Sequence, residues 1–155
     1  MSNNILHNEQ TMSFDLRKFG SSDREEVFGF LRAMADLREN VEQWVNIDKK
    51  LVLIEIDREH PYMQHVTPLN KTYAEWNPEL EELQFIVGGY IQFVSHGLKG
   101  YQFMCNEEGS LINLPHNMFM NLFLAYFTEM EVEQLQDIAG TCILGLSEAF
   151  EEAKE

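Results

Sequence analysis

The feature that most constrains this fold is a change in the spacing of apolar residues within residues 83–117, at the pair Gly88-Gly89. Residues 79–87 have helical spacing, and glycine readily ends a helix because it enters positive φ without steric cost. Residues 90–94 and 101–105 are rich in aromatic and β-branched side chains, which indicates two strands of a hairpin. The composition then predicts a turn at Asn106, Glu107, Glu108 and Gly109.

This order of elements resembles a small domain family found mainly in phage and mobile-element proteins. The resemblance rests on ELEELQFIVGGYI at 79–91, NEEG at 106–109, LPHN ending at Asn117, and DIAGT at 137–141. It covers roughly residues 76–145 and includes no catalytic motif. The family's function is uncharacterised, so the resemblance implies a small domain without assigning an activity.

The net charge of −15 is concentrated after residue 50. Residues 1–50 hold 7 Lys and Arg against 9 Asp and Glu, whereas residues 51–155 hold 4 against 17. Such a field repels nucleic-acid phosphates and membrane surfaces and attracts basic protein surfaces. We therefore expect no direct binding to nucleic acid or membrane. The alternative interpretation is that the acidic residues only keep the chain soluble.

Cysteine usage and the N-terminal sequence predict a cytoplasmic protein, in the host cell if it is phage-encoded. Cys105 and Cys142 both lie in predicted strands, and residues 1–10 lack the basic start and apolar run of a signal peptide. Residues 109–128 carry no formal charge, but their asparagines and a proline favour a buried helix over a membrane span.

A regular apolar seam predicts a long helix that begins near Ser22-Asp23-Arg24-Glu25, a sequence typical of a capping box. The spacing alternates between three and four residues and places one side chain per turn on the same face. This face either packs on its own domain or forms a dimer or partner-helix seam. Its members are Val27, Phe30, Met34, Leu37, Val41 and Trp44.

Residues 51–56 form an apolar run of strand length, and residues 58–76 then lack a clear period. With two prolines, this second segment predicts a long loop containing one short strand near residues 64–67. Its aromatic residues either anchor the loop or line a pocket for a phosphorylated ligand. The candidate pocket residues are Arg58, Tyr62, Tyr73 and Trp76.

The remaining elements complete an α+β fold with a small, mainly antiparallel sheet and helices packed on it. Asn117 is predicted to cap a buried helix at 118–127, and residues 138–146 are predicted to form the last strand. Residues 1–12 are expected to be an extended or mobile tail. We divide the chain into residues 1–48, a polar tail plus amphipathic helix, and residues 49–155, an acidic domain.

No catalytic, metal or cofactor site is predicted. No two of the five histidines have the helical spacing that pairs ligands, and His60 and His65 are the nearest pair. Asp57 and Glu59 flank Arg58. Such a carboxylate pair could act in acid–base chemistry, but charged residues at this position are also an ordinary way to end a strand. Gly88-Gly89 follows a helix and precedes a strand, which is the reverse of a phosphate-binding loop. Cys105 lies inside an apolar strand, where a thiol is unreactive.

Three functions remain open. The first is a non-enzymatic, phage-type accessory protein that binds and modulates a host protein, in host takeover or anti-defence, with a homodimer as a further candidate assembly. The second is a protein that binds or sequesters a small ligand or nucleotide signal. The third is an enzyme of unrecognised mechanism, for which no residue pattern gives positive support.

Overall fold

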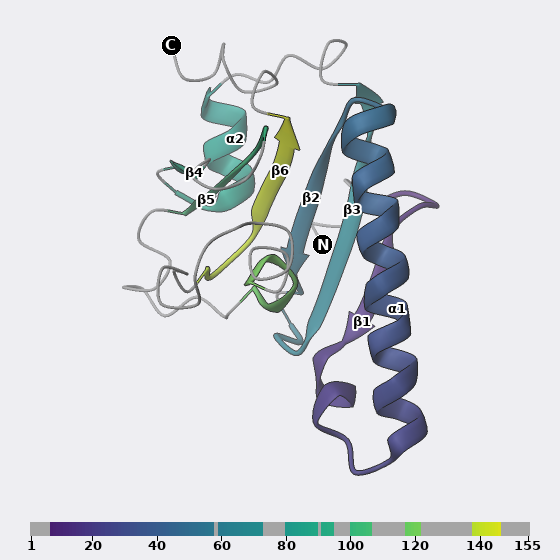
Figure 1. Cartoon of the computed structure of the whole chain (residues 1–155). Coiled ribbons are helices and arrows are strands. Elements are labelled where there is room, and N and C mark those ends of the chain that lie inside the picture. Colours follow the sequence, from purple (N-terminus) through teal and green to yellow (C-terminus); the bar gives the residue numbers. More distant parts are fainter. Residues whose placement is uncertain are drawn as a thin grey trace.

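The computed structural model describes residues 7–57, 59–72, 80–89, 91–94, 100–106, 117–121 and 138–146. These residues form a six-stranded sheet with helices packed beside it (Figure 1), and all pairings between the described strands are antiparallel. The strand order is β1-β3-β2-β6-β5-β4. This arrangement confirms the predicted α+β class.

The described part of the chain contains six strands, two α-helices and two shorter helical segments. The described elements are β1 (Met12–Asp15), the 3-10 helix η2 (Leu16–Gly20), α1 (Arg24–Glu42), the π-helical turn η3 (Gln43–Ile47), β2 (Lys50–Ile56), β3 (Met63–Thr72), α2 (Leu80–Val87), β4 (Ile91–Val94), β5 (Tyr101–Asn106) and β6 (Cys142–Leu146). In the part of the chain that is described, no helix has both the length and the apolar character needed to cross a membrane.

Helix α1 begins one residue later than the sequence predicted. Its N-cap is Asp23, whose carboxylate accepts a hydrogen bond from the amide of Glu25 at 2.9 Å. Ser22 does not fill this position because the hydroxyl of Ser21 accepts from the Asp23 amide at 3.0 Å, which forms a preceding turn. At its other end α1 continues into η3, where the neighbouring residues Trp44 and Val45 are both buried.

Strand β3 is the main departure from the sequence analysis, which predicted a long loop with a strand only near residues 64–67. It runs for 10 residues and lies between β1 and β2. The prediction was wrong because Gln64 and Thr67 are polar and yet fully buried, which hid the strand pattern. Pro68 also argued against a strand because it lacks a backbone donor. It lies beyond the residues that β1 pairs, where the register with β2 shifts.

The central strands are buried on both faces of the sheet. One set of alternating side chains joins α1 in the main core, and the set between them faces the other way and is equally buried. The first set includes Val52, Ile54, Phe103, Cys105, Cys142 and Leu144, and the second includes Leu51, Leu53, Met104 and Ile143. Helix α1 runs beside β3 and β2, and α2 lies beside β4 and β5 (Figure 1).

The two glycines after α2 have different structural roles. Gly88 has φ +85° and ends the helix, and the amides of Gly88 and Gly89 both donate to the carbonyl of Gln84. Gly89 instead allows the Asn106 side chain to lie close to the backbone, because a Cβ at residue 89 would be 2.8 Å from Nδ2 of Asn106. Asn106 is the last residue of β5, paired with Ile91, so its assignment to the turn was wrong by one residue.

The predicted cap at Asn117 is confirmed, and it belongs to a larger buried network. Its side chain is fully buried and its Oδ1 accepts from the Met120 amide at 3.0 Å and from Nε2 of Gln64 at 2.8 Å. Its Nδ2 donates to the carbonyls of Gly140 at 2.9 Å and Ile54 at 3.2 Å. One side chain therefore ties a helix start to β3, to β2 and to the segment before β6.

The N-terminal segment is joined to the sheet from residue 7 onward, so its description as a tail was wrong for the residues that are described. Asn8 Nδ2 donates to the Pro68 carbonyl at 2.7 Å, and the Thr11 and Thr67 hydroxyls lie 2.9 Å apart. The predicted domain boundary after residue 48 falls between η3 and β2. Side chains from both sides of this boundary pack in one core.

Candidate functional site

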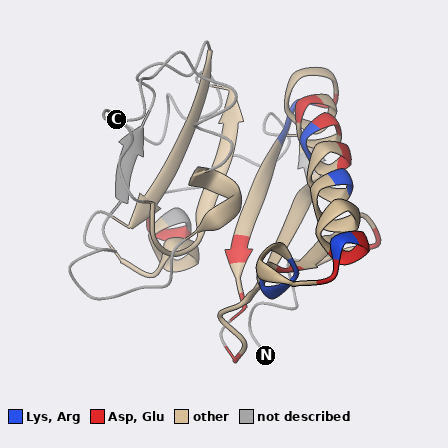
Figure 2. Ribbon diagram, turned by 60° about the horizontal axis from the view of Figure 1, so that its bottom comes forward, with Lys and Arg blue, Asp and Glu red and all other residues tan. Residues whose placement is uncertain are grey.

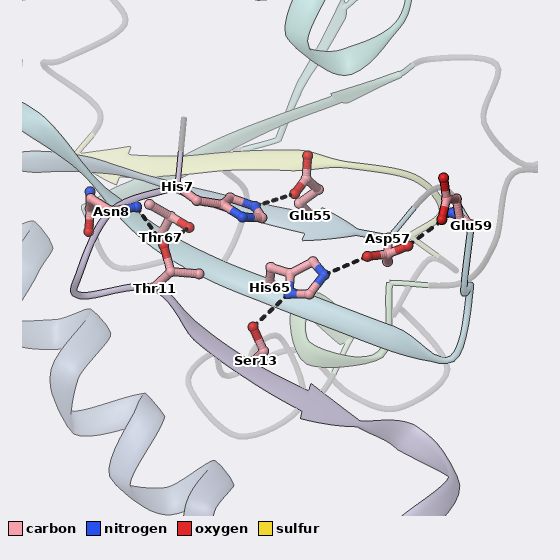
Figure 3. Close-up of polar contacts among 9 residues, drawn as sticks. All are labelled: His7, Asn8, Thr11, Ser13, Glu55, Asp57, Glu59, His65 and Thr67. Atoms are coloured by element: carbon pink, nitrogen blue, oxygen red, sulfur yellow. Dashed lines mark hydrogen bonds and ion pairs between the residues drawn. The ribbon is translucent and has the colours of Figure 1, made fainter. Parts of the chain in front are cut away.

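The candidate site is a polar group on the face of the sheet that points away from α1. We call it the histidine cluster and define it as His7, Ser13, Glu55, Asp57 and His65 (Figure 3). His65 is central: the register places Ser13 opposite it on β1 and Glu55 opposite it on β2. The alternation of side chains in these strands puts all three on one face.

Asp57 follows β2 directly and has two roles. Its Oδ1 accepts from the amides of Glu59 and His60, both at 2.9 Å, which shapes the turn into β3. Its Oδ2 lies 2.9 Å from Nε2 of His65. The hydrogen bond from His65 is the main cause that lowers the pKa of Asp57, assisted by the two amides and opposed by burial. Asp57 is therefore an anion that is held in position on both oxygens.

This anion fixes the tautomer of His65. An ionised carboxylate can only accept, so Nε2 of His65 carries a proton, and in the neutral form of the ring Nδ1 keeps its lone pair. Nδ1 lies 2.6 Å from the hydroxyl oxygen of Ser13, which then acts as the donor. The result is a linear arrangement in which Ser13 donates to His65 and His65 donates to Asp57.

The second histidine covers the first. His7 lies with its ring centre 5.1 Å from that of His65, tilted by 54°, and its Nε2 is 2.7 Å from Oε1 of Glu55. The Glu55 side chain is only 6% exposed, so this pair satisfies a carboxylate that would otherwise be costly to bury. By contrast, Ser13 is exposed at the outer edge of the sheet.

Chemically, the arrangement provides a hydroxyl whose proton can move to an imidazole that a carboxylate orients, which is the arrangement of acid–base and nucleophilic sites. It does not favour a metal: no three His, Cys, Asp or Glu side chains within the described residues are grouped so that they could hold an ion. The cluster could not be predicted from residue spacing, because Ser13 lies 52 residues before His65. The available signal was the polar character of alternate positions in β1 and β3.

The predicted seam on α1 faces its own sheet. Four of its six members are buried in the core, Met34 packs against that core and Val27 is half-buried. Phe30 contacts the rings of Phe14 and Phe19 edge-on or tilted. These side chains therefore pack on their own domain. The buried members are Phe30, Leu37, Val41 and Trp44.

Of the candidate pocket, only Tyr62 is described. The guanidinium of Arg17 lies 3.8 Å from its ring centre, and its hydroxyl is 3.2 Å from Nδ1 of His60. Arg17 in turn contacts Asp15 through a 2.7 Å ion pair. Tyr62 thus anchors the β2–β3 turn to η2. The other three pocket residues, Arg58, Tyr73 and Trp76, lie outside the described residues, as do Glu107, Glu108 and Gly109 of the turn motif.

Both cysteines are buried thiols, as the sequence predicted. Burial raises the pKa of Cys105 to about 11, and it raises that of Cys142 as well. Neither thiol is therefore a thiolate near neutral pH, which leaves them as apolar side chains of the core.

A family match covers two thirds of the chain. Residues 49–151 match the model of a domain of unknown function, DUF3846. The chain belongs to this family. No curated protein and no solved structure matches it. The DUF3846 match includes β2 to β6 and the Asn117 network, whereas β1, α1 and therefore His7 and Ser13 precede it.

Proposed function

We propose that this protein acts by binding another protein, and that the outer face of α1 is the surface that does so. The observation that carries the proposal is the exposure of two large apolar side chains on that face. Phe28 is 56% exposed and Leu31 is 45% exposed, although the opposite face of the same helix packs in the core. Exposed aromatic side chains of this kind are typical of the anchors of protein interfaces.

Charged side chains surround these two residues. Helix α1 carries Arg24, Arg32 and Arg38 together with five acidic residues, and Figure 2 shows these charges distributed along the helix. Charges around an apolar centre supply orientation and association rate more than affinity. The outer face of α1 therefore has the composition of an apolar contact with a charged rim.

The position of α1 in the chain supports a role specific to this protein. The DUF3846 match begins at residue 49, after the helix has ended. Side chains on the outer face of a helix that precedes a shared domain can differ among family members without altering the core, to which only the opposite face of the helix contributes. The net charge of −15, which is concentrated after residue 50, favours a partner with a basic surface through long-range attraction to the whole molecule and disfavours nucleic acid.

Within this proposal, the partner is a host protein and the chain is a phage-type accessory protein that modulates it without catalysis, in host takeover or anti-defence. The support is the acidity of the chain and the resemblance of the motifs at residues 79–91 and 106–109 to a family found mainly in phage and mobile-element proteins. A host protein with a basic surface, of the kind that normally binds nucleic acid, fits this charge. A second copy of the chain is the alternative partner for this surface.

The test compares capture by the wild type and two matched variants in a bacterial lysate. Phe28→Ala removes the aromatic anchor on α1, and Phe85→Ala removes a 75% exposed phenylalanine from α2. We expect the wild type and Phe85→Ala to retain the same stoichiometric protein, which leaves at high salt, and Phe28→Ala to lose it. Equal retention by all three proteins would contradict the proposal for α1.

A further inference from the structure

We propose that Ser13 is an activated nucleophile that accepts an acyl group from a neutral, activated ester. This inference goes beyond the proposed binding function, because it concerns the face of the sheet that points away from α1. It rests on the geometry of three side chains, Ser13, His65 and Asp57, which the sheet register brings together from three separate segments.

The direction of the hydrogen bonds supports this role for Ser13. Two amides hold Asp57, which accepts a hydrogen bond from Nε2 of His65, so in the neutral form of the ring the lone pair of Nδ1 faces the hydroxyl of Ser13. The hydroxyl of Ser13 lies 2.6 Å from Nδ1. This distance is within the range required of a general base and the group that it deprotonates.

His65 is held rigidly, and Ser13 is accessible to solvent. His65 is 14% exposed and lies between its two strand neighbours with His7 over its ring, so it is held in one orientation. Ser13 lies on β1, an edge strand of the sheet, and its side chain is exposed. An acyl donor can therefore reach the hydroxyl oxygen while the base behind it is shielded from water.

The acyl group passes from the ester to the Ser13 oxygen. The oxygen of Ser13 attacks the carbonyl carbon of the ester while Nδ1 of His65 takes the hydroxyl proton. The bond between carbonyl carbon and leaving oxygen then breaks, and the imidazolium returns that proton to the departing alcohol or phenol. Asp57 stabilises the imidazolium formed in between. The products are an ester at Ser13 and a free alcohol or phenol, with no change in oxidation state.

The charges around Ser13 select the class of donor. Glu55 and Asp57 are carboxylates on or directly after β2, on the same face as Ser13, whereas the charge of Asp15 is offset by its 2.7 Å ion pair with Arg17. The field of Glu55 and Asp57 disfavours an anionic donor such as a phosphate ester. A neutral carboxylic ester meets no such repulsion.

The experiment uses the full chain with p-nitrophenyl acetate and follows acetylation by peptide mass spectrometry with fragmentation. Ser22, which is exposed just before α1, is the internal control because it reports ordinary serine reactivity in the same molecule. We expect Ser13 to react about 100-fold faster than Ser22, the range for a positioned general base.

Two variants test the roles of His65 and Asp57 in activating Ser13. His65→Gln keeps a donor toward Asp57 but has no basic nitrogen, and we expect it to reduce acetylation of Ser13 to the rate of Ser22. Asp57→Asn keeps an oxygen for the turn amides but removes the anion, and we expect a reduction of about tenfold or more. Acetylation of Ser13 no faster than that of Ser22 would overturn the proposal, and so would an unchanged Ser13 rate in a folded His65→Gln variant.

Discussion

Replacing Asn117 with alanine removes the side chain that connects the most parts of the described fold. Asn117 is fully buried and its amide makes four hydrogen bonds to nitrogen and oxygen atoms of neutral groups, two as acceptor and two as donor. Alanine leaves Nε2 of Gln64, the Met120 amide and the carbonyls of Ile54 and Gly140 without this partner. Water cannot replace it without entering the core.

The expected loss of stability follows from these four hydrogen bonds. At roughly 1 kcal/mol net for each neutral hydrogen bond, the loss is about 4 kcal/mol of the free energy of unfolding. That is a large part of the ~5–15 kcal/mol that stabilises a single domain. With a urea slope of about 2 kcal/mol per molar, the unfolding midpoint moves down by about 2 M.

Urea unfolding followed by circular dichroism measures this shift, with Asn70→Ala as the matched control. Asn70 is an exposed asparagine in β3, and we expect its replacement to change the unfolding free energy by less than about 0.5 kcal/mol. Asn117→Asp separates the effect of side-chain shape from that of hydrogen bonding. It keeps the oxygen that accepts two hydrogen bonds, but it places a carboxylate against the two carbonyl oxygens that Nδ2 contacts. It should therefore destabilise the fold at least as much as alanine does at neutral pH. An Asn117→Ala loss as small as that of Asn70→Ala would refute the reasoning.

Three further predictions concern other parts of the structure. Leu37→Ala should lower the free energy of unfolding by about 2–5 kcal/mol because the side chain is 1% exposed, whereas Leu31→Ala on the outer face should cost less than about 0.5 kcal/mol in the same urea assay. Because the pKa of Asp57 is lowered in the folded state, its stabilisation is present above the ordinary carboxyl pKa and is lost as pH falls through the lowered value. The difference in unfolding free energy between wild type and Asp57→Asn should therefore shrink as urea curves are measured at progressively more acidic pH, and a constant difference would contradict this account. Finally, Cys105 and Cys142 should react with Ellman's reagent at neutral pH only after denaturation, and rapid reaction of the native protein would show that they are not buried.

The sequence predicted well those elements whose pattern is set by local chemistry. Helix α1 could be predicted because its apolar spacing matches one core face, and β2 because a run of branched apolar residues of strand length lies between polar breaks. The end of α2 could be predicted because Gly88 adopts the positive φ that glycine permits. The cap at Asn117 could be predicted because an asparagine before an apolar run commonly accepts from the first helical amides.

Where the sequence failed, distant residues decide the structure. Gln64 looks like a loop residue until Asn117, 53 residues later, provides the partner that allows its burial. Strand β1 has only four residues and gains its strand character from pairing with β3. The histidine cluster joins Ser13 to His65 and Asp57 through strand register, and no short motif encodes such an arrangement.

The most direct test of the proposed function is the affinity of the captured partner for purified wild type, Phe28→Ala and Phe85→Ala, measured at low and high salt. If the outer face of α1 is the binding surface, Phe28→Ala should raise the dissociation constant by about tenfold or more while Phe85→Ala leaves it unchanged, and high salt should weaken binding of the wild type. Equal dissociation constants for all three proteins, or binding that does not change with salt, would contradict the account.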